Sequence, residues 1–196
     1  MGKIRLDRQY SIQEYLAILH DAETKYEYVD GHLVAMSGGT INHNRICTNI
    51  LADLSYRLRS SPAGCEVFGA DQKIAIPNRN SYLFPDVSVV CPPLQVNPDD
   101  AQAISNPVLI IEVASKSTRH FDAGGKFNFY QSLPSLQEFI LVEQYAPLVT
   151  LYQLTEDVTW RIQQISKLEN SLDLKSLGVT IPLQEIYRNV VFAAES

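Results

Sequence analysis

Two strongly apolar runs in the middle of the chain each carry one carboxylate. Asp86 lies in FPDVSVVC at residues 84–91, and Glu112 lies in VLIIEVA at residues 108–114. Four to eight large or β-branched apolar residues in a row are typical of strands buried on both faces. A carboxylate in such a strand costs several kcal/mol unless it is protonated, hydrogen-bonded or bound to a metal ion. The pair therefore predicts a divalent-cation site on two neighbouring strands.

The composition is typical of a folded protein with a substantial core. The chain has 196 residues, of which 45% are hydrophobic and 19% are charged, which predicts one domain over residues 1–196. No apolar stretch approaches the roughly 18 residues of a membrane span. The first five residues lead into no apolar segment of a signal peptide. We therefore predict a cytoplasmic protein with no membrane contact.

The formal net charge of −6 bears on nucleic-acid binding. Proteins that bind nucleic acid indiscriminately are usually basic. Acidic nucleases nevertheless exist, because metal ions and a local basic strip can supply the phosphate contacts. The negative net charge argues against a nuclease but does not exclude one.

Three cysteines, Cys47, Cys65 and Cys91, are widely spaced and form no C-x-x-C pair. The odd number and the spacing argue against a zinc knuckle and against a disulfide framework. We predict that all three are small buried apolar residues.

Helical and strand patterns alternate irregularly along the chain. The spacing of Ser11 and Glu14 predicts a capped helix, and Asp30-Gly31 between two apolar runs predicts a hairpin. Helices are expected over residues 12–20, 40–59, 123–133 and 181–187, strands over 26–29, 32–36, 66–76, 84–91, 108–114, 136–142, 148–154 and 158–165, and a surface loop over 92–107. This order predicts an α/β fold with a mixed sheet flanked by helices.

The two carboxylates belong to a wider set of segments. Pro85-Asp86, followed 26 positions later by Glu112, resembles the skeleton of the PD-(D/E)XK nuclease superfamily. The segments that accompany this pair are YEYVDG at 26–31, FPDVSVV at 84–90, IEVASKSTR at 111–119, Asp122 with Lys126 and Tyr130, and QEFILV at 137–142. Together they resemble the Uma-two family of restriction endonucleases, over roughly residues 10–190.

The resemblance implies a restriction-endonuclease-like mixed sheet with additional antiparallel strands. It also implies a metal-dependent endonuclease that hydrolyses DNA phosphodiester bonds with Mg²⁺ or Mn²⁺. These hard cations prefer oxygen ligands, so Asp86 and Glu112 are the expected ligands, and the superfamily implies the Val113 carbonyl as a third. A homodimer would suit the cutting of two strands. The alternative is that each carboxylate caps a backbone group or pairs with an arginine.

A lysine usually stands two residues after the strand glutamate in this superfamily, where it points into the same cavity. Here that position is Ala114. We expect Lys126 on the following helix to supply the lysine, with Tyr130 one turn later on the same face. Lys116 is the competing candidate, and Lys126 as a solvated helix residue stays an alternative.

Two further residues are candidates for the site. Glu27 fits the position of an early acidic residue that completes the metal site in many such nucleases, although a hairpin glutamate can also face solvent. His43 is expected near the N-terminus of the second helix, where the positive dipole end favours a neutral imidazole, and it could equally be packed or exposed. Arg119 could contact phosphate or pair with Asp122.

Three classes of function compete. A metal-dependent DNA endonuclease is the main hypothesis. A catalytically inactive nuclease-fold module that binds nucleic acid or regulates is the alternative, motivated by Ala114 and the acidic charge. A metal-free acid/base hydrolase using Asp86 and Glu112 is the least favoured, since the sequence has no aromatic-rich sugar cleft. The sequence distinguishes neither DNA from RNA nor any recognition sequence.

Overall fold

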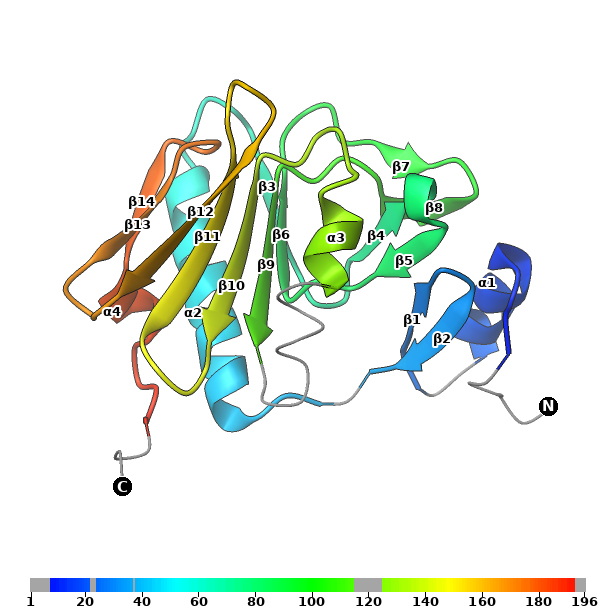
Figure 1. The fold of residues 1–196 in the computed structure, drawn as a ribbon, viewed down its shortest axis with the longest axis horizontal. Coiled ribbons are helices and arrows are strands. Elements are labelled where there is room, and N and C mark those ends of the chain that lie inside the picture. Colours follow the sequence, from blue (N-terminus) through cyan, green and yellow to red (C-terminus); the bar gives the residue numbers. More distant parts are fainter. Residues whose placement is uncertain (1–7, 22–23, 37, 115–124, 193–196) are drawn as a thin grey trace.

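The chain folds into an α/β structure with two six-stranded mixed sheets and a separate two-stranded hairpin (Figure 1). The computed structural model describes residues 8–21, 24–36, 38–114 and 125–192. The predicted fold class, a mixed sheet flanked by helices with additional antiparallel strands, is confirmed. Lys116, Arg119 and Asp122 lie outside the described residues.

The central sheet contains both apolar runs of the sequence. In spatial order its strands are β12 (Trp160–Ser166), β11 (Leu148–Leu154), β10 (Glu138–Glu143), β9 (Leu109–Ala114), β6 (Val87–Val90) and β3 (Glu66–Gly69). β9 pairs parallel with β10 and antiparallel with β6. Every residue of these three strands is buried, as expected for strands covered on both faces.

The second sheet holds the predicted hairpin at its edge. Its order is β2 (His32–Ala35), β1 (Tyr26–Val29), β5 (Ser81–Leu83), β4 (Lys73–Ile76), β8 (Asp100–Ile104) and β7 (Val96–Asn97). Asp30 and Gly31 adopt φ angles of 47° and 86°, the left-handed conformation that a two-residue hairpin turn requires.

Two strand predictions are wrong in detail. Residues 66–76 form two strands in different sheets rather than one, because a turn closed by the Gln72 N–H and the Gly69 carbonyl separates β3 from β4. Residues 92–107 are not all loop, since β7 and β8 lie within them. Both strands are short or polar, so the pairing of β8 with β4 and of β7 with β8 depends on contacts that the local pattern does not reveal.

Helices cover the central sheet on both faces (Figure 1). The described helices are α1 (Ile12–Asp21), α2 (Ile41–Leu58), the 3-10 turn η1 (Pro77–Arg79), α3 (Phe127–Tyr130) and α4 (Leu183–Ile186). α2 packs Ile46, Ile50 and Leu54 onto one face, together with α4 and the hairpin of β13 (Ser171–Leu174) and β14 (Val179–Pro182). α3 lies on the opposite face.

The helix starts agree with the sequence. Ser11 and Glu14 form the predicted capping box, with Ser11 N–H donating to Glu14 Oε2 at 2.8 Å and Glu14 N–H donating to Ser11 Oγ at 3.2 Å. Thr40 caps α2 as expected. The helix expected over residues 123–133 is a single regular turn, α3, in the described part of that range.

The cysteine prediction is wrong for two of the three residues. Cys65 and Cys91 form a disulfide with a Cα–Cα distance of 4.0 Å. Cys65 directly precedes β3 and Cys91 directly follows β6, and Glu66 pairs with Val90, so the two cysteines lie opposite each other across the strands. This register, with partners 26 positions apart in the chain, is not visible in the sequence. Cys47 is free and partly buried.

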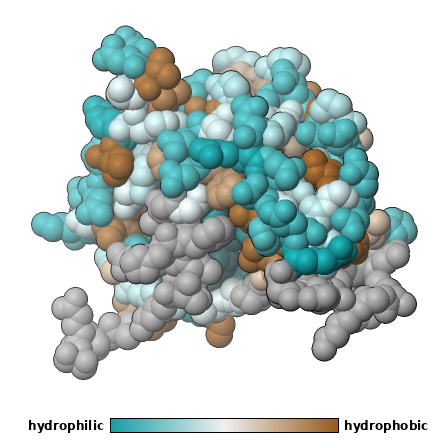
Figure 2. Space-filling model, turned by 45° about the vertical axis from the view of Figure 1, so that its right-hand side comes forward, coloured by the Kyte–Doolittle hydropathy of each residue, from teal (hydrophilic) through white to brown (hydrophobic). Residues whose placement is uncertain are grey.

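Exposed apolar residues do not gather into one large patch on the visible face (Figure 2). Large exposed apolar side chains come from both ends of α2, with Ile41 and Tyr56, and from other segments, with Val158 and Val191. Within the described residues, every helix is too short or too polar to cross a membrane.

Candidate active site

The two carboxylates of the apolar runs meet where β6 begins and β9 ends. Val87 pairs with Ile111, so Asp86 falls opposite Glu112 at the next position of the antiparallel ladder. The Asp86 carboxylate accepts a hydrogen bond of 2.7 Å from the Val113 N–H. In an antiparallel ladder the N–H and C=O of one residue project to the same neighbour. The Val113 carbonyl therefore projects toward the same edge of β9 as the Asp86 carboxylate.

Lys126 lies between two buried glutamates. Its Nζ is 2.9 Å from Glu27 Oε1 and 3.2 Å from Glu112 Oε1. The exposed fractions are 4% for Glu27, 4% for Glu112 and 8% for Lys126. Lys126 is therefore not a solvated helix residue, and Glu27 does not face solvent. The fold brings the three residues together from β1, β9 and the start of α3.

Glu27 is held in place by the backbone as well. Its Oε1 accepts a hydrogen bond of 3.1 Å from the Phe84 N–H, two residues before Asp86. This bond ties β1 of the second sheet to the segment that leads into β6 of the central sheet. The position of Glu27 relative to Asp86 is thus fixed by a short connection.

Tyr130 donates a hydrogen bond of 3.1 Å from its hydroxyl to Glu112 Oε1. Burial raises the pKa of Tyr130 well above its ordinary value, and the nearby charges of Glu112 and Glu27 add to that rise. The hydroxyl therefore keeps its proton and acts as a neutral donor. Tyr130 lies one turn after Lys126, as the spacing predicts.

His43 approaches the cluster from α2. Thr40 Oγ1 accepts from the His43 N–H at 3.1 Å, and His43 Nε2 lies 3.2 Å from Asp86 Oδ2. A Cβ atom on Gly39 would lie 2.5 Å from His43 Nδ1, so only glycine lets the backbone pass this close to the imidazole. The predicted position of His43 near the helix N-terminus is confirmed.

Cys47 contacts the other side of the same imidazole. Its Sγ is 3.6 Å from His43 Nδ1. Burial raises the pKa of the Cys47 thiol, and the charges of Asp86 and Glu112 raise it further. A protonated thiol donates to Nδ1, which leaves the imidazole proton on Nε2, facing the Asp86 carboxylate.

Gln144 is a site residue that sequence reasoning missed. It is 1% exposed; its Nε2 donates to the Ala114 carbonyl at 2.8 Å, and its Oε1 accepts from the Thr40 hydroxyl. Gln144 thus ties the end of β9 to the cap of α2, which carries His43. A polar residue directly after the apolar strand β10 is the only sequence signal for it.

The cluster is rich in carboxylates. Lys126 contacts Glu27 and Glu112, and Asp86 contacts the imidazole of His43, so three carboxylates lie in one largely buried region. Buried carboxylates are stabilised by nearby positive charge, which a divalent cation would supply. The donor set suits such an ion, since carboxylate and carbonyl oxygens are the ligands of Mg²⁺ and Mn²⁺.

A second arrangement of donor atoms shares Asp86. One ligand atom each from His43, Cys47 and Asp86 lies within 4.8 Å of the others. Imidazole and thiol ligands suit softer ions such as Zn²⁺. The protonated thiol and its contact with Nδ1 make this set a poorer match than the oxygen set, because a thiol must lose its proton to bind a metal.

Comparisons with known proteins agree with this fold. The structure is similar to a crystal structure from Anabaena variabilis, described as a putative nuclease belonging to DUF820, with a TM-score of 0.75 and 13% identity over 93% of this chain and 99% of that chain. The class defined by the fold is therefore that of a nuclease-fold protein.

The family follows from sequence. Residues 12–184 match the Uma2 family model, described as "putative restriction endonuclease", and the chain belongs to this family. Two uncharacterized proteins of Synechocystis sp. are similar to it. One is 36% identical over 182 residues, with 93% of each chain covered, and the other is 34% identical over 152 residues, with 78% of this chain and 85% of the relative covered.

Proposed function

We propose that the protein is a metal-dependent endonuclease that hydrolyses DNA phosphodiester bonds through the cluster around Asp86 and Glu112. The observation that carries the proposal is the contact of Lys126 with both Glu112 and Glu27, beside Asp86. It assembles the residue types of a PD-(D/E)XK site although Ala114 occupies the usual lysine position. Membership of a family described as putative restriction endonucleases supports the same activity.

Asp86, Glu112 and the Val113 carbonyl would hold the cation, Mg²⁺ or Mn²⁺. When bound, the ion would supply a Lewis acid for the phosphate and lower the pKa of a bound water. The three carboxylates gathered in the cluster support a doubly charged ion. The Val113 N–H keeps the Asp86 carboxylate oriented for this role.

Lys126 would orient the attacking water and offset the charge that develops on the phosphate. Ala114 is fully buried in the same apolar cluster as Phe127 and Tyr130, where an ammonium group without a partner would be costly. Lys126 reaches the same carboxylates from the next element. Glu27 would hold the ammonium group in place from the opposite side.

His43 would position Asp86 and contact the phosphate or a water. Its Nε2–H faces the Asp86 carboxylate and can hold that carboxylate in place. The other hydrogen-bond donors of the site then remain available for the substrate. Thr40 holds the His43 backbone N–H, Cys47 contacts the ring at Nδ1, and Gly39 leaves room for the ring.

The test is cleavage of supercoiled plasmid with Mg²⁺ or Mn²⁺. We expect nicking by the native protein and none by the Asp86→Asn or Lys126→Met variants. Asp157→Asn is the matched control, since Asp157 is an exposed carboxylate in the turn between β11 and β12. Equal nicking by Asp86→Asn and the native protein would exclude catalysis at this cluster, and an RNA substrate in parallel decides between the nucleic acids.

A catalytically inactive module that binds nucleic acid or regulates is the second candidate. Ala114 at the usual lysine position and the net charge of −6 favour it. Calorimetric titration with Mn²⁺ separates the two functions. An inactive module need not bind the ion, whereas the nuclease must bind it and must lose that binding in Glu112→Gln.

Three further expectations stay predictions: the homodimer, the cytoplasmic location and the single domain over residues 1–196. Light scattering would measure the mass in solution and so test the homodimer.

A further inference from the structure

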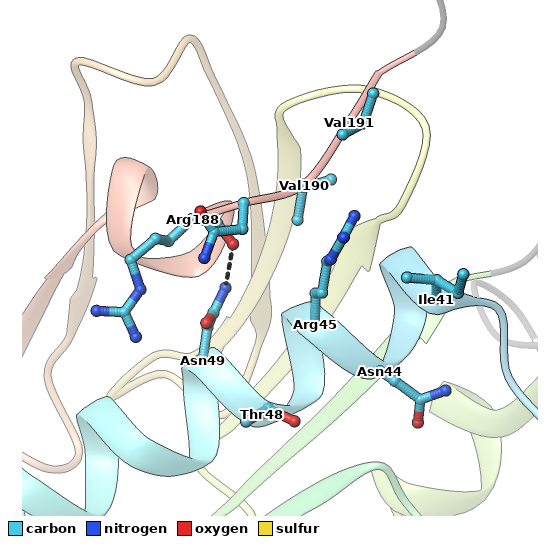
Figure 3. Close-up of a pocket in the computed structure, with 9 residues that line it drawn as sticks. Ile41, Asn44, Arg45, Thr48, Asn49, Arg188, Val190 and Val191 are labelled. Carbon is cyan, nitrogen blue, oxygen red and sulfur yellow. Dashed lines mark hydrogen bonds between the residues drawn. The ribbon is translucent and has the colours of Figure 1, made fainter.

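A polar groove lies beside the candidate active site, between the first turns of α2 and the segment that follows α4 (Figure 3). Figure 3 shows Arg45 rising from α2 toward Val190, with Asn44 and Thr48 on neighbouring turns. The guanidinium of Arg188 extends to the other side of Asn49. Arg45 and Arg188 thus flank Asn49 with two separate cationic groups.

The charge of this groove differs from that of the rest of the molecule. Its lining has two arginines, three asparagines and one threonine, and no carboxylate. Two other cavities in the described part of the chain do contain carboxylates, on Glu138 and Glu156 in one and on Asp71 and Asp100 in the other. The chain has a net charge of −6. A polyanion bound in this groove would contact arginines, and none of the lining side chains is a carboxylate.

The groove is preformed by side-chain bonds to the backbone. Asn49 Nδ2 donates to the carbonyls of Ile186 and Arg188 at 3.0 and 2.9 Å, and Asn42 Nδ2 donates to the Val191 carbonyl at 2.8 Å. These bonds hold residues 186–191 against α2. The guanidinium groups make long contacts. Arg45 Nη1 donates to Asn42 Oδ1 at 3.4 Å, and Arg188 makes a 3.7 Å surface contact with Glu185 of the kind that contributes little.

The groove and the candidate active site share one helix. His43 contacts Asp86, and Arg45, two residues later, lines the groove on another face of α2. Figure 1 shows that β9 ends and α2 begins at the same end of the molecule. An α-helix is about 10 Å wide, so a bound DNA strand of a few nucleotides is long enough to reach from one face of α2 to the other.

We propose that this groove binds the phosphate backbone of the DNA substrate on one side of the cut. The inference rests on the proposed function, because it names a second contact of the same substrate. The planar guanidinium groups of Arg45 and Arg188 bind phosphate oxygens in pairs, and the Thr48 hydroxyl lines the same groove. Such contacts fix the register of the duplex without reading its sequence.

The experiment measures the affinity of the full chain for a short fluorescent duplex, with Ca²⁺ in place of Mg²⁺, as salt rises from about 50 to 200 mM. Arg45→Gln and Arg188→Gln are each expected to weaken binding severalfold and to reduce the slope of log K against log salt by about 1, and the double variant by about 2. Arg57→Gln is the matched control, because Arg57 lies on the same helix but is paired with Asp53 at 2.6 Å.

Three results would overturn the inference. The double variant could leave the slope of log K against log salt unchanged, Arg57→Gln could weaken DNA binding equally, or the native protein could bind no duplex. A shift from dimer to monomer in the arginine variants, with unchanged DNA affinity, assigns the groove to a second copy of the chain instead. If the native protein binds DNA with the expected slopes yet never nicks plasmid, the proposed catalysis fails while the groove stands.

Discussion

Two buried glutamates on adjacent parallel strands have opposite surroundings. Glu112 on β9 and Glu138 on β10 are 4% and 1% exposed. Glu138 accepts hydrogen bonds from Gln153 Nε2 at 2.7 Å, from the backbone N–H groups of Lys175 and Ser176 at 3.1 and 3.3 Å, and from the Ser176 hydroxyl. Glu112 instead shares one ammonium group with Glu27, near a third carboxylate.

The difference separates a structural carboxylate from a functional candidate. Neutral donors from the start of the β13–β14 connection satisfy Glu138 fully, so its charge serves to fix that connection against β10. Glu112 instead shares the ammonium group of Lys126 with Glu27, beside Asp86 at the start of the neighbouring strand. Burial alone therefore does not mark a site; the gathering of further carboxylates around the buried group does.

The largest contrast is expected between Glu112→Gln and Glu138→Gln. Loss of a cation ligand should lower plasmid nicking by about 10³-fold, since a bound metal contributes several kcal/mol to such reactions. Glu138→Gln should keep nicking within about threefold but lower the free energy of unfolding by about 2 kcal/mol, because bonds to a charged acceptor are lost. Nicking rates and urea unfolding measure both. Equal loss of nicking in the two variants would contradict the distinction between a functional Glu112 and a structural Glu138.

Lys126→Met should destabilise the protein by about 3 kcal/mol, because it leaves buried carboxylates without their cation. Addition of Mn²⁺ should recover most of that loss, since the ion then balances the charge. Lys73→Met is the matched control. Lys73 is 7% exposed and pairs with Asp100, away from Asp86, so thermal unfolding of that variant should not respond to Mn²⁺. A response of equal size in both would contradict a cation site at the Glu112 cluster.

Gly39→Ala should lower nicking by about tenfold, because the new Cβ would lie 2.5 Å from His43 Nδ1 and displace the ring. Gly38→Ala should have no effect, since nothing lies within 4 Å of its Cβ position. The two adjacent substitutions change the same loop with the same residue type. If they reduce nicking equally, the position of His43 is not what matters.

The smallest expected effect is alkaline loss of stability. Burial raises the pKa of Tyr82 to about 12 and that of Tyr130 further, while the unfolded chain ionises near pH 10. Below pH 10 both states keep their protons and stability is constant; above it the unfolded chain alone loses protons, so stability falls. Urea unfolding at pH 8, 10 and 11 measures this, and a rise in stability above pH 10 would contradict it.

The sequence predicted the pair Asp86 and Glu112 because a carboxylate in a buried strand is costly wherever the strand lies. The convergence of Glu27 and Lys126 on Glu112 followed from the family resemblance, and the geometry agrees with it. Yet Glu138 also lies in an apolar strand, and no local sequence pattern distinguishes it from Glu112. What distinguishes the two is the identity of neighbours from distant segments.

Other features depend on three-dimensional register and could not be predicted. Gln144 and Cys47 become site residues only because α2 begins beside the end of β9. The Cys65–Cys91 disulfide requires the pairing of β3 with β6. Short polar strands such as β7 owe their pairing to the second sheet rather than to their own residues.

The most direct test of the central claim is the anomalous scattering of a crystal soaked in Mn²⁺. The account predicts one strong peak about 2.1 Å from oxygens of Asp86, Glu112 and the Val113 carbonyl, which disappears in Glu112→Gln and persists in Glu138→Gln. A crystal with no peak at this cluster, or one whose peak lies on His43 and Cys47 and survives Glu112→Gln, would contradict it.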